Sequence, residues 1–550
     1  MTLLSRVIER LAKLPPATHR LGRVERDVPV PMDDGVRLLA DVYHPAGTAP
    51  APTVLMRSPY GRRNVGALLG PIHARRGFRL VVESCRGTFG SGGTFRPQFD
   101  ERADGLATLR WLERQPWFDG RLAMSGPSYL GYVQWAIASD AGPALAALCP
   151  HITMSNLAAH WYAGGSFSLD DALGWSMMVS TQERRFAGLA QLFGIGARRV
   201  ARHIDELPLL TLDERILGRR VPFWRDFVSH ASVRDPFWAP ADHSQRVADV
   251  RVPVAMVGGW YDIFLPLQLA DYRALAGAGN PPWLVIGPWT HTAPAGMGEQ
   301  LRDSLAWFAA HLGRDRSRLR ADPVRLYVMG AGEWRGCASW PPGGYTPEPW
   351  HLHAGGRLAR EAPGVSEPDH YRYDPADPTP IAGGTLLSAR AGPRDQRATE
   401  ARADVLTYTS DVLERDVEVI GEVAAELFVS SNQGHFDVFV RLCDVDERGR
   451  STNVCDGIER IEPGRWRRRV DGVLSVRVAL SPTAQRFRRG HRIRIQVSSG
   501  AHPRFARNLG TGEPLATGTA LRSSEQSIYH GPAWPSAILL PVGPSPRPSR

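Results

Sequence analysis

In the N-terminal part of the chain, apolar and polar residues follow a regular pattern that predicts alternating strands and helices. Residues 24–48 alternate in strand fashion, and short apolar runs separated by helical patterns follow. A short apolar run bounded by polar residues is typical of a buried strand, and repeated strand–helix units favour a mostly parallel sheet with helices on both faces. The runs that we interpret as strands are 53–56, 80–82, 122–124 and 146–149, and 104–112 is predicted to be a helix.

The texture changes between residues 155 and 245, where helical periodicity dominates and aromatic residues are frequent. This pattern predicts a helical cap inserted into the sheet domain. Strand patterns then resume at 252–257 and 283–286, and a helix is expected at 301–312. We therefore assign residues 1–154 and 246–318 to an α/β domain and 155–245 to the cap.

A third texture begins near residue 319. Short alternating strands with turns between them recur, as at 436–442 and 492–497. This pattern is typical of an antiparallel sandwich such as a jelly roll, so residues 319–550 are predicted to form an all-β domain. The stretch 372–404, rich in Pro, Asp, Gly and Arg, is expected to be a long surface loop.

The strongest chemical signal is the motif Gly126-Pro127-Ser128-Tyr129-Leu130-Gly131. It follows the apolar run 122–124 and precedes a helical pattern, which puts Ser128 on a sharp strand-to-helix turn. A serine in this setting, with small residues on either side, is the nucleophile elbow of the α/β-hydrolases. The helix N-terminus beside Ser128 would face an oxyanion formed there. Taken alone, the motif fits a turn serine that caps a helix equally well.

The two strands after the predicted cap each lead to a candidate catalytic residue. The run 252–257 leads to Asp262, and 283–286 leads to His291. In α/β-hydrolases the acid and the histidine follow the nucleophile in this order, each on a loop after a strand. Singly, Asp262 could be a helix N-cap and His291 a loop residue. Together with Ser128, they predict a catalytic triad.

The loop after the run 53–56 is the candidate for an oxyanion hole. It reads Arg57-Ser58-Pro59-Tyr60-Gly61. In this fold the loop lies near the nucleophile, so Tyr60 could donate its phenolic O–H, and Tyr129, the residue after the nucleophile, its backbone N–H. From the residues alone, a tyrosine beside a proline is more often a packing residue.

Composition limits the partners of the chain. A net charge of +10 would suit a nucleic-acid binder, but the arginines are interleaved with acids and the densest basic run, 465–469, is short. The five cysteines are far apart and form no Cys-x-x-Cys pair, which disfavours a disulfide framework or a metal site. No stretch resembles a signal peptide or a transmembrane helix. We expect a cytoplasmic protein that binds no nucleic acid, membrane, metal or cofactor; a homodimer is compatible with the sequence.

Several ordered strings together resemble the cocaine esterase (CocE/NonD) family of serine hydrolases, which is related to X-Pro dipeptidyl-peptidases and α-amino-acid ester hydrolases. They span most of the chain and include 58–61, 86–93, 126–131, 259–262, 287–291, 328–330, 453–457 and 503–508. The resemblance implies an α/β-hydrolase core, a helical cap and a jelly roll. It also supports Tyr60 as an oxyanion donor.

The resemblance implies cleavage of carboxylic esters, and of some amides, in small-molecule substrates through an acyl-enzyme. The amino-acid ester hydrolases of this group hold a substrate ammonium with acidic residues, whereas Asp262 is followed here by Ile263-Phe264-Leu265. An unpaired buried ammonium is costly, so we expect apolar or aromatic acyl groups, with Trp175 and Phe264 lining their pocket. Dipeptidyl-peptidase, acylase or aminopeptidase activity is one alternative, and a non-catalytic binding protein on a hydrolase scaffold is another.

Overall fold

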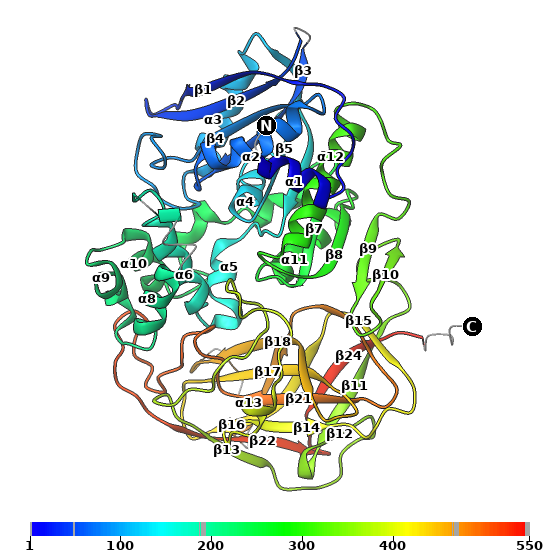
Figure 1. The fold of residues 1–550 in the computed structure, drawn as a ribbon. Helices are drawn as coiled ribbons and strands as arrows, with labels where there is room; N and C mark the ends of the chain where they lie inside the picture. The colour runs from blue at the N-terminus through cyan, green and yellow to red at the C-terminus, as the bar shows by residue number, and fades with distance from the viewer. Residues whose placement is uncertain are drawn as a thin grey trace. The chain divides into compact units, whose positions relative to one another are not determined.

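The computed structural model describes residues 3–47, 50–185, 187–188, 194–464, 466 and 472–544. The described chain folds into two compact units (Figure 1). The first contains Met1–Ala158, Val179–Gly188 and Pro236–Arg325, and the second contains Ala159–Met178, Leu189–Asp235 and Leu326–Arg550. The boundaries of core, cap and sandwich expected from the sequence stay predictions. Of the basic run 465–469, only Trp466 lies within the described residues.

The first unit is built on a twisted sheet with the strand order β1-β2-β4-β3-β5-β6. Strands β3 to β6 pair in parallel, and β1 and β2 add an antiparallel edge. A parallel bridge between Leu148 and Val254 continues the sheet from β6 to β7, which pairs in parallel with β8. The strands are β1 (Leu21–Pro31), β2 (Arg37–Pro45), β3 (Ala51–Ser58), β4 (Arg79–Ser84), β5 (Phe118–Pro127), β6 (Leu145–His151), β7 (Ala255–Tyr261) and β8 (Trp283–Thr290).

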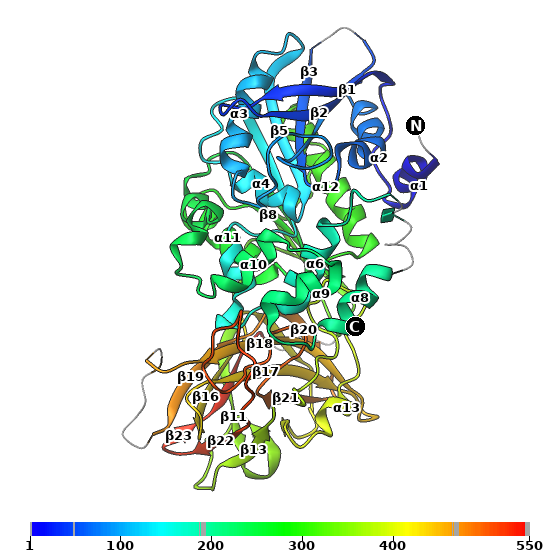
Figure 2. The same cartoon turned by 90° about the vertical axis from the view of Figure 1, so that its left-hand side faces the viewer.

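Helices cover both faces of this sheet, as the strand–helix pattern predicts. Figure 2 shows α3, α4 and α11 on one side and α1, α2 and α12 on the other. Alternate strand residues, such as Val54 and Met56 of β3, pack with residues of α2 and α12 in one buried core. The helices are α1 (Leu3–Leu11), α2 (Arg62–Ala74), α3 (Glu101–Glu113), α4 (Tyr129–Trp135), α11 (Leu265–Gly277) and α12 (Pro294–His311).

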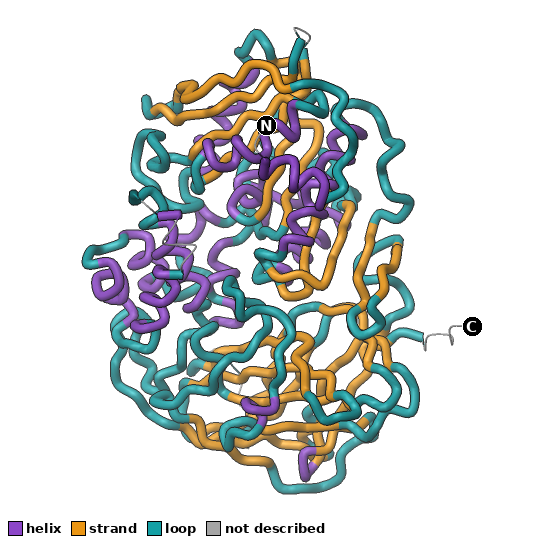
Figure 3. The backbone as a smooth tube through the Cα atoms, viewed as in Figure 1, coloured by secondary structure: helices purple, strands orange, loops and turns teal. Residues whose placement is uncertain are grey.

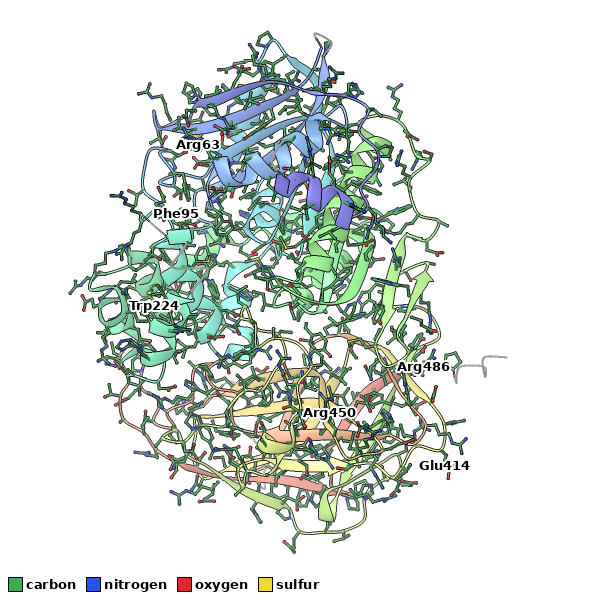
Figure 4. The ribbon with its side chains drawn as sticks, viewed as in Figure 1. Arg63, Phe95, Trp224, Glu414, Arg450 and Arg486 are labelled. Carbon is green, nitrogen blue, oxygen red and sulfur yellow. The ribbon has the colours of Figure 1, made fainter. Side chains whose placement is uncertain are left out.

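In its described residues, the segment 155–245 consists of helices and connecting loops, and several of its aromatic residues pack against one another. Trp224 is fully buried among these helices (Figure 4), where its Nε1–H donates to the carbonyl of Leu209 at 3.1 Å. The rings of Trp161 and Phe227 lie 5.3 Å apart. The α-helices here are α5 (Leu157–Trp161), α6 (Leu169–Val179), α8 (Ile195–His203), α9 (Leu212–Leu217) and α10 (Pro222–Ser229).

The C-terminal part of the chain consists mainly of strands and loops (Figure 3), and its described strands pair almost entirely antiparallel, which confirms the fold class expected from its alternating pattern. In β19, for example, buried and exposed residues alternate without interruption. The stretch 372–404 is loop apart from the end of β13 and the short helix α13 (Arg397–Glu400).

The strands of this part range from two residues in β23 to 11 residues in β18. They are β11 (Thr346–His353), β12 (Arg357–Ala359), β13 (Asp369–Tyr373), β14 (Leu406–Thr409), β15 (Val417–Gly421), β16 (Ala424–Ser431), β17 (Phe436–Val445), β18 (Ser451–Ile461), β19 (Leu474–Ala479), β20 (Thr483–Phe487), β21 (Arg492–Ser498), β22 (Ser524–Gly531), β23 (Trp534–Pro535) and β24 (Ala537–Val542). Strands β9 (Val324–Val328) and β10 (Glu333–Cys337) instead belong to the sheet of β7 and β8, in the order β10-β9-β8-β7. In the described part of the chain, no helix has the length and apolar character needed to cross a membrane.

Candidate active site

Ser128 occupies the turn between β5 and α4 in a strained backbone conformation, with φ 57° and ψ −123°. Non-glycine residues rarely adopt positive φ, and a nucleophile elbow requires it. The flanking glycines make the turn sterically possible. A Cβ on Gly126 would lie 2.3 Å from Leu130 Cβ, and a Cβ on Gly131 would lie 2.6 Å from Thr153 Cγ2. Any side chain at either position would push helix α4 away from the strands.

Hydrogen bonds from the end of β6 hold this conformation. The Ser128 N–H donates to the carbonyl of His151 at 3.0 Å, and Thr153 Oγ1 donates to the carbonyl of Ser128 at 2.7 Å. The buried Gln134 side chain of α4 bonds in both directions with the backbone of Cys149 in β6. These hydrogen bonds stabilise the strained backbone conformation of Ser128, as is common at functional sites.

Asp262 and His291 form a hydrogen-bonded pair at the ends of neighbouring strands. The Asp262 carboxylate is fully buried, and its Oδ2 lies 2.8 Å from His291 Nδ1. The backbone N–H of Phe264 donates to the other carboxylate oxygen, Oδ1, at 2.8 Å. Since an ionised carboxylate only accepts hydrogen bonds, the pair keeps the proton on Nδ1 and leaves Nε2 as the basic nitrogen.

A bulge beside the pair sets the position of His291. Gly259 pairs with Gly287 and Tyr261 pairs with Thr290, so β8 carries one extra residue between the two pairings. A Cβ on Gly259 would lie 2.4 Å from the carbonyl oxygen of Trp289, which makes glycine necessary there. Bulges re-aim side chains at sheet ends, and this one directs the chain into the loop that carries His291.

Ser128 and the Asp262–His291 pair share one edge of the sheet, because β5, β7 and β8 run in parallel and each residue directly follows its strand. Within the described residues, no hydrogen bond joins Ser128 Oγ to His291. Catalytic hydrogen bonds are often long before substrate binds, and tighten in the Michaelis complex.

A second histidine near the elbow is unsuited to act as the base. His151 is 1% exposed, and both of its ring nitrogens are engaged: Nδ1 accepts the Val257 N–H at 3.1 Å and Nε2 lies 2.8 Å from Ser304 Oγ. Burial lowers the pKa of His151 to about 3, so the ring stays neutral. His151 ties β6 to β7 and α12.

Tyr60 and Tyr129 lie against each other beside the elbow. Tyr60 follows β3 and is half-buried, and its ring meets that of Tyr129 edge-on with centroids 6.4 Å apart. The Tyr129 side chain is buried: its O–H donates to Glu101 Oε1 at 2.5 Å and accepts the Gln98 N–H at 2.9 Å. Burial and the Glu101 carboxylate raise the pKa of Tyr129 well above its ordinary value. The Tyr129 hydroxyl is thus engaged inside the protein, and the backbone N–H is the group of Tyr129 that could bind a substrate.

The chain is similar along nearly its whole length to proteins of known activity. Residues 34–293 match the X-Pro dipeptidyl-peptidase (S15 family) model, and 319–539 match the model of the X-Pro dipeptidyl-peptidase C-terminal non-catalytic domain. Cocaine esterase of Rhodococcus sp. (strain MB1 Bresler) is 34% identical, over 94% of this chain and 98% of the esterase. The chain belongs to the cocaine esterase (CocE/NonD) family. It is a serine ester hydrolase.

Solved structures show the same fold in relatives of the CocE/NonD family. An α-amino acid ester hydrolase superposes with a TM-score of 0.80 at 22% identity, covering 96% of this chain and 98% of its own. An aminopeptidase from a marine sediment Thaumarchaeota archaeon superposes with a TM-score of 0.79 at 24% identity, with the same coverages. These likenesses confirm the α/β-hydrolase core and the all-β C-terminal domain expected from the sequence.

The two residues expected to line the acyl pocket have other contacts in the structure. Phe264 is 7% exposed, and its ring meets the His291 imidazole edge-on at 5.3 Å. Trp175, in α6, is 8% exposed and meets the ring of Phe223 edge-on at 6.1 Å. Phe264 thus contacts the candidate base His291 through its ring, and its N–H donates to Asp262. A role for either residue in substrate binding stays a prediction.

The structure adds site residues that sequence reasoning missed. Gln182 donates its Nε2–H to the carbonyl of Pro59 at 2.7 Å and so anchors the loop that carries Tyr60. Arg57 and Glu101 form a buried ion pair behind the same loop. Arg57 could have been recognised from the sequence, because an arginine that directly continues an apolar strand is buried and needs a buried partner for its charge. Nothing in the local sequence marked Gln182.

Proposed function

We propose that this CocE/NonD family member hydrolyses carboxylic esters through an acyl-enzyme on Ser128, with His291 as general base. Asp262 holds His291 in the reactive tautomer. The Tyr60 O–H and the Tyr129 N–H form the oxyanion hole. The observation that carries this proposal is the buried Asp262–His291 hydrogen bond at the same sheet edge as the strained Ser128.

The proposed reaction uses these residues, the ester and one water molecule. Ser128 Oγ attacks the ester carbonyl while its proton passes to His291 Nε2, and the resulting oxyanion accepts hydrogen bonds from Tyr60 and Tyr129. Collapse of this intermediate breaks the bond to the leaving oxygen, which takes the proton from His291 and departs as the alcohol. Water then attacks the acyl-enzyme by the same route and releases the carboxylic acid.

The acyl group is proposed to be apolar or aromatic. Ile263, Phe264 and Leu265 follow Asp262 and supply no carboxylate, so a substrate ammonium would be left without a partner there. Small-molecule esters of this kind are the proposed substrates. X-Pro dipeptidyl-peptidase or aminopeptidase activity is the alternative, favoured by the family models and by the structural likeness to an aminopeptidase.

A matched substrate pair tests this proposal. Methyl phenylacetate and methyl phenylglycinate differ only at the α-carbon, where the second ester carries an ammonium. We expect kcat/KM for the phenylacetate to be higher by about 10²-fold or more, because an uncompensated buried charge costs roughly 3–5 kcal/mol. Alanyl-proline p-nitroanilide should be hydrolysed poorly. A preference for the phenylglycinate would indicate an amino-acid ester hydrolase. A preference for the anilide would indicate a peptidase.

Replacing Tyr60 by phenylalanine tests the oxyanion hole. The change removes the hydroxyl and keeps the ring against Tyr129, so it separates hydrogen bonding from packing. We expect kcat to fall about 10²–10³-fold, or roughly 3–4 kcal/mol of transition-state stabilisation, with KM and Tm nearly unchanged. Steady-state kinetics and a melting curve check this. If most activity remains, Tyr60 is a packing residue and a backbone amide of its loop, such as that of Gly61, supplies the second donor.

A further inference from the structure

A buried polar cluster lies behind the two proposed oxyanion donors. We call Arg57, Glu83, Glu101 and Tyr129 the Arg57 cluster. Arg57 is fully buried and lies between two carboxylates, with Nε 2.7 Å from Glu83 Oε1 and Nη1 2.8 Å from Glu101 Oε2. The other Glu101 oxygen, Oε1, accepts the Tyr129 O–H at 2.5 Å. One carboxylate therefore bridges an arginine of strand β3 and a tyrosine of helix α4.

Each of the two buried carboxylates has a different second partner. Glu83 Oε2 accepts the Thr108 hydroxyl at 2.8 Å and does not contact Tyr129. Although burial acts to lower the pKa of Arg57, the carboxylates of Glu101 and Glu83 raise it well above its ordinary value, so the guanidinium stays charged. A hydrogen bond from a tyrosine hydroxyl to an ionised carboxylate is strong in a buried site of low dielectric constant.

Within this cluster, Glu101 is the residue that holds the Tyr129 side chain. Tyr129 directly follows Ser128 and begins α4, so its side chain helps to set the position of the N–H that we propose as an oxyanion donor. The ring is enclosed by those of Tyr60, Phe95 and Tyr132, with centroids 6.2–6.4 Å away, and its hydroxyl is held by Glu101. Phe95, one of these neighbouring rings, is labelled in Figure 4.

The same cluster reaches the second proposed donor. Arg57 belongs to β3, three residues before Tyr60, and its Nη1–H also donates to the backbone carbonyl of Glu101 at 2.9 Å. The Tyr60 loop and the nucleophile elbow are thus connected through Arg57 and Glu101, with Tyr60 and Tyr129 in ring contact at the far end.

We propose that Glu101 is a positioning residue for the oxyanion hole: by holding the Tyr129 hydroxyl and pairing with Arg57, it fixes the Tyr129 N–H relative to Ser128. The inference rests on the proposed acyl-enzyme mechanism. It assigns Glu101 no contact with substrate. Its effect should therefore appear in the transition state and be absent from ground-state binding.

The first test replaces Glu101 by glutamine. An amide has one oxygen and one NH₂ group, so the variant cannot place an oxygen both beside the Arg57 guanidinium and at the Tyr129 hydroxyl. We expect kcat to fall about 10–10²-fold with KM within about twofold, since small misplacements of catalytic groups cost on the order of 10²-fold. The affinity for an aryl trifluoromethyl ketone, whose adduct with Ser128 carries an oxyanion, should fall by the same factor as kcat.

Glu83→Gln is the matched control. Glu83 is as buried as Glu101 and also pairs with Arg57, so this variant loses a comparable buried ion pair. We expect its Tm to fall as much as that of Glu101→Gln while its kcat stays within about twofold of wild type, because the Tyr129 hydroxyl keeps its partner. Equal losses of kcat in the two variants would overturn the proposal, since the cluster would then act only through stability.

Tyr129→Phe tests the same link from the other side. It removes the hydroxyl that Glu101 holds and keeps the backbone N–H, so the double variant Glu101→Gln/Tyr129→Phe should lose little more kcat than either single variant. Additive losses would contradict a shared path. Ser128→Ala separates this inference from the mechanism beneath it: if that variant is inactive and Glu101→Gln is fully active, only the positioning role fails. If Ser128→Ala is active, the proposed acyl-enzyme mechanism on Ser128 is wrong, and the positioning role that rests on it is wrong as well.

Discussion

Replacing Ser128 by alanine is expected to lower kcat by about 10⁴-fold or more, with the fold intact. The change deletes the one oxygen that the strained elbow presents beside the helix N-terminus, and no acyl-enzyme can then form. The strain at φ 57° is a backbone property held by the carbonyl of His151 and by the glycine contacts, so alanine fits the same turn. Hydrolysis of a p-nitrophenyl ester, followed to the limit of detection, measures the loss.

Ser125→Ala is a suitable control for this loss. Ser125 lies on β5, three residues before Ser128, and its buried hydroxyl is 3.2 Å from Ser304 Oγ. We expect the Ser125→Ala variant to keep activity near that of wild type. If Ser128→Ala retained more than about a tenth of wild-type activity, Ser128 could not be the nucleophile.

Replacing Asp262 by asparagine is expected to cost about 10⁴-fold in kcat while KM changes little. The physical reason lies in the two oxygens of this carboxylate. The Phe264 N–H donates to Oδ1, so an asparagine would keep its oxygen there and turn its NH₂ group toward His291 Nδ1. Nδ1 would then have to accept, the proton would move to Nε2, and the imidazole could no longer take the proton of Ser128.

The outcome for Asp262→Asn is read from kcat and KM at the pH of maximal activity, with the melting temperature as the check on folding. The side chain keeps its size, so packing in this buried site should be preserved. A loss of less than about tenfold would mean that His291 does not depend on Asp262 for its tautomer, and that another acid or none orients the base.

Much of the fold was predictable because periodicity and chain order determine it. Short apolar runs alternating with helical patterns gave the parallel sheet and its helices, and the alternation after residue 319 gave the all-β part. The strand ends also indicate the candidate site: Ser128, Asp262 and His291 each directly follow a parallel strand, and such strands present their carboxyl ends at one edge.

The support around the site could not be predicted, because it is made by contacts between residues far apart in the sequence. Glu101 meets Tyr129 across 28 positions, and Gln182 meets Pro59 across 123. A sequence shows that Arg57 needs a buried partner but not which acid provides it. Aromatic residues were likewise ambiguous. Trp175 packs against Phe223, a contact that composition cannot distinguish from a place in a substrate pocket.

The most direct test of the account is to locate the acyl group during turnover. The enzyme is mixed with an excess of a p-nitrophenyl ester, quenched in acid within the burst, digested and mapped by mass spectrometry. The account predicts that the acyl mass is found on the peptide that contains Ser128, and that the Ser128→Ala protein, treated in the same way, carries no acyl group. An acyl group on another residue, or hydrolysis with a burst and no modified Ser128, would contradict it.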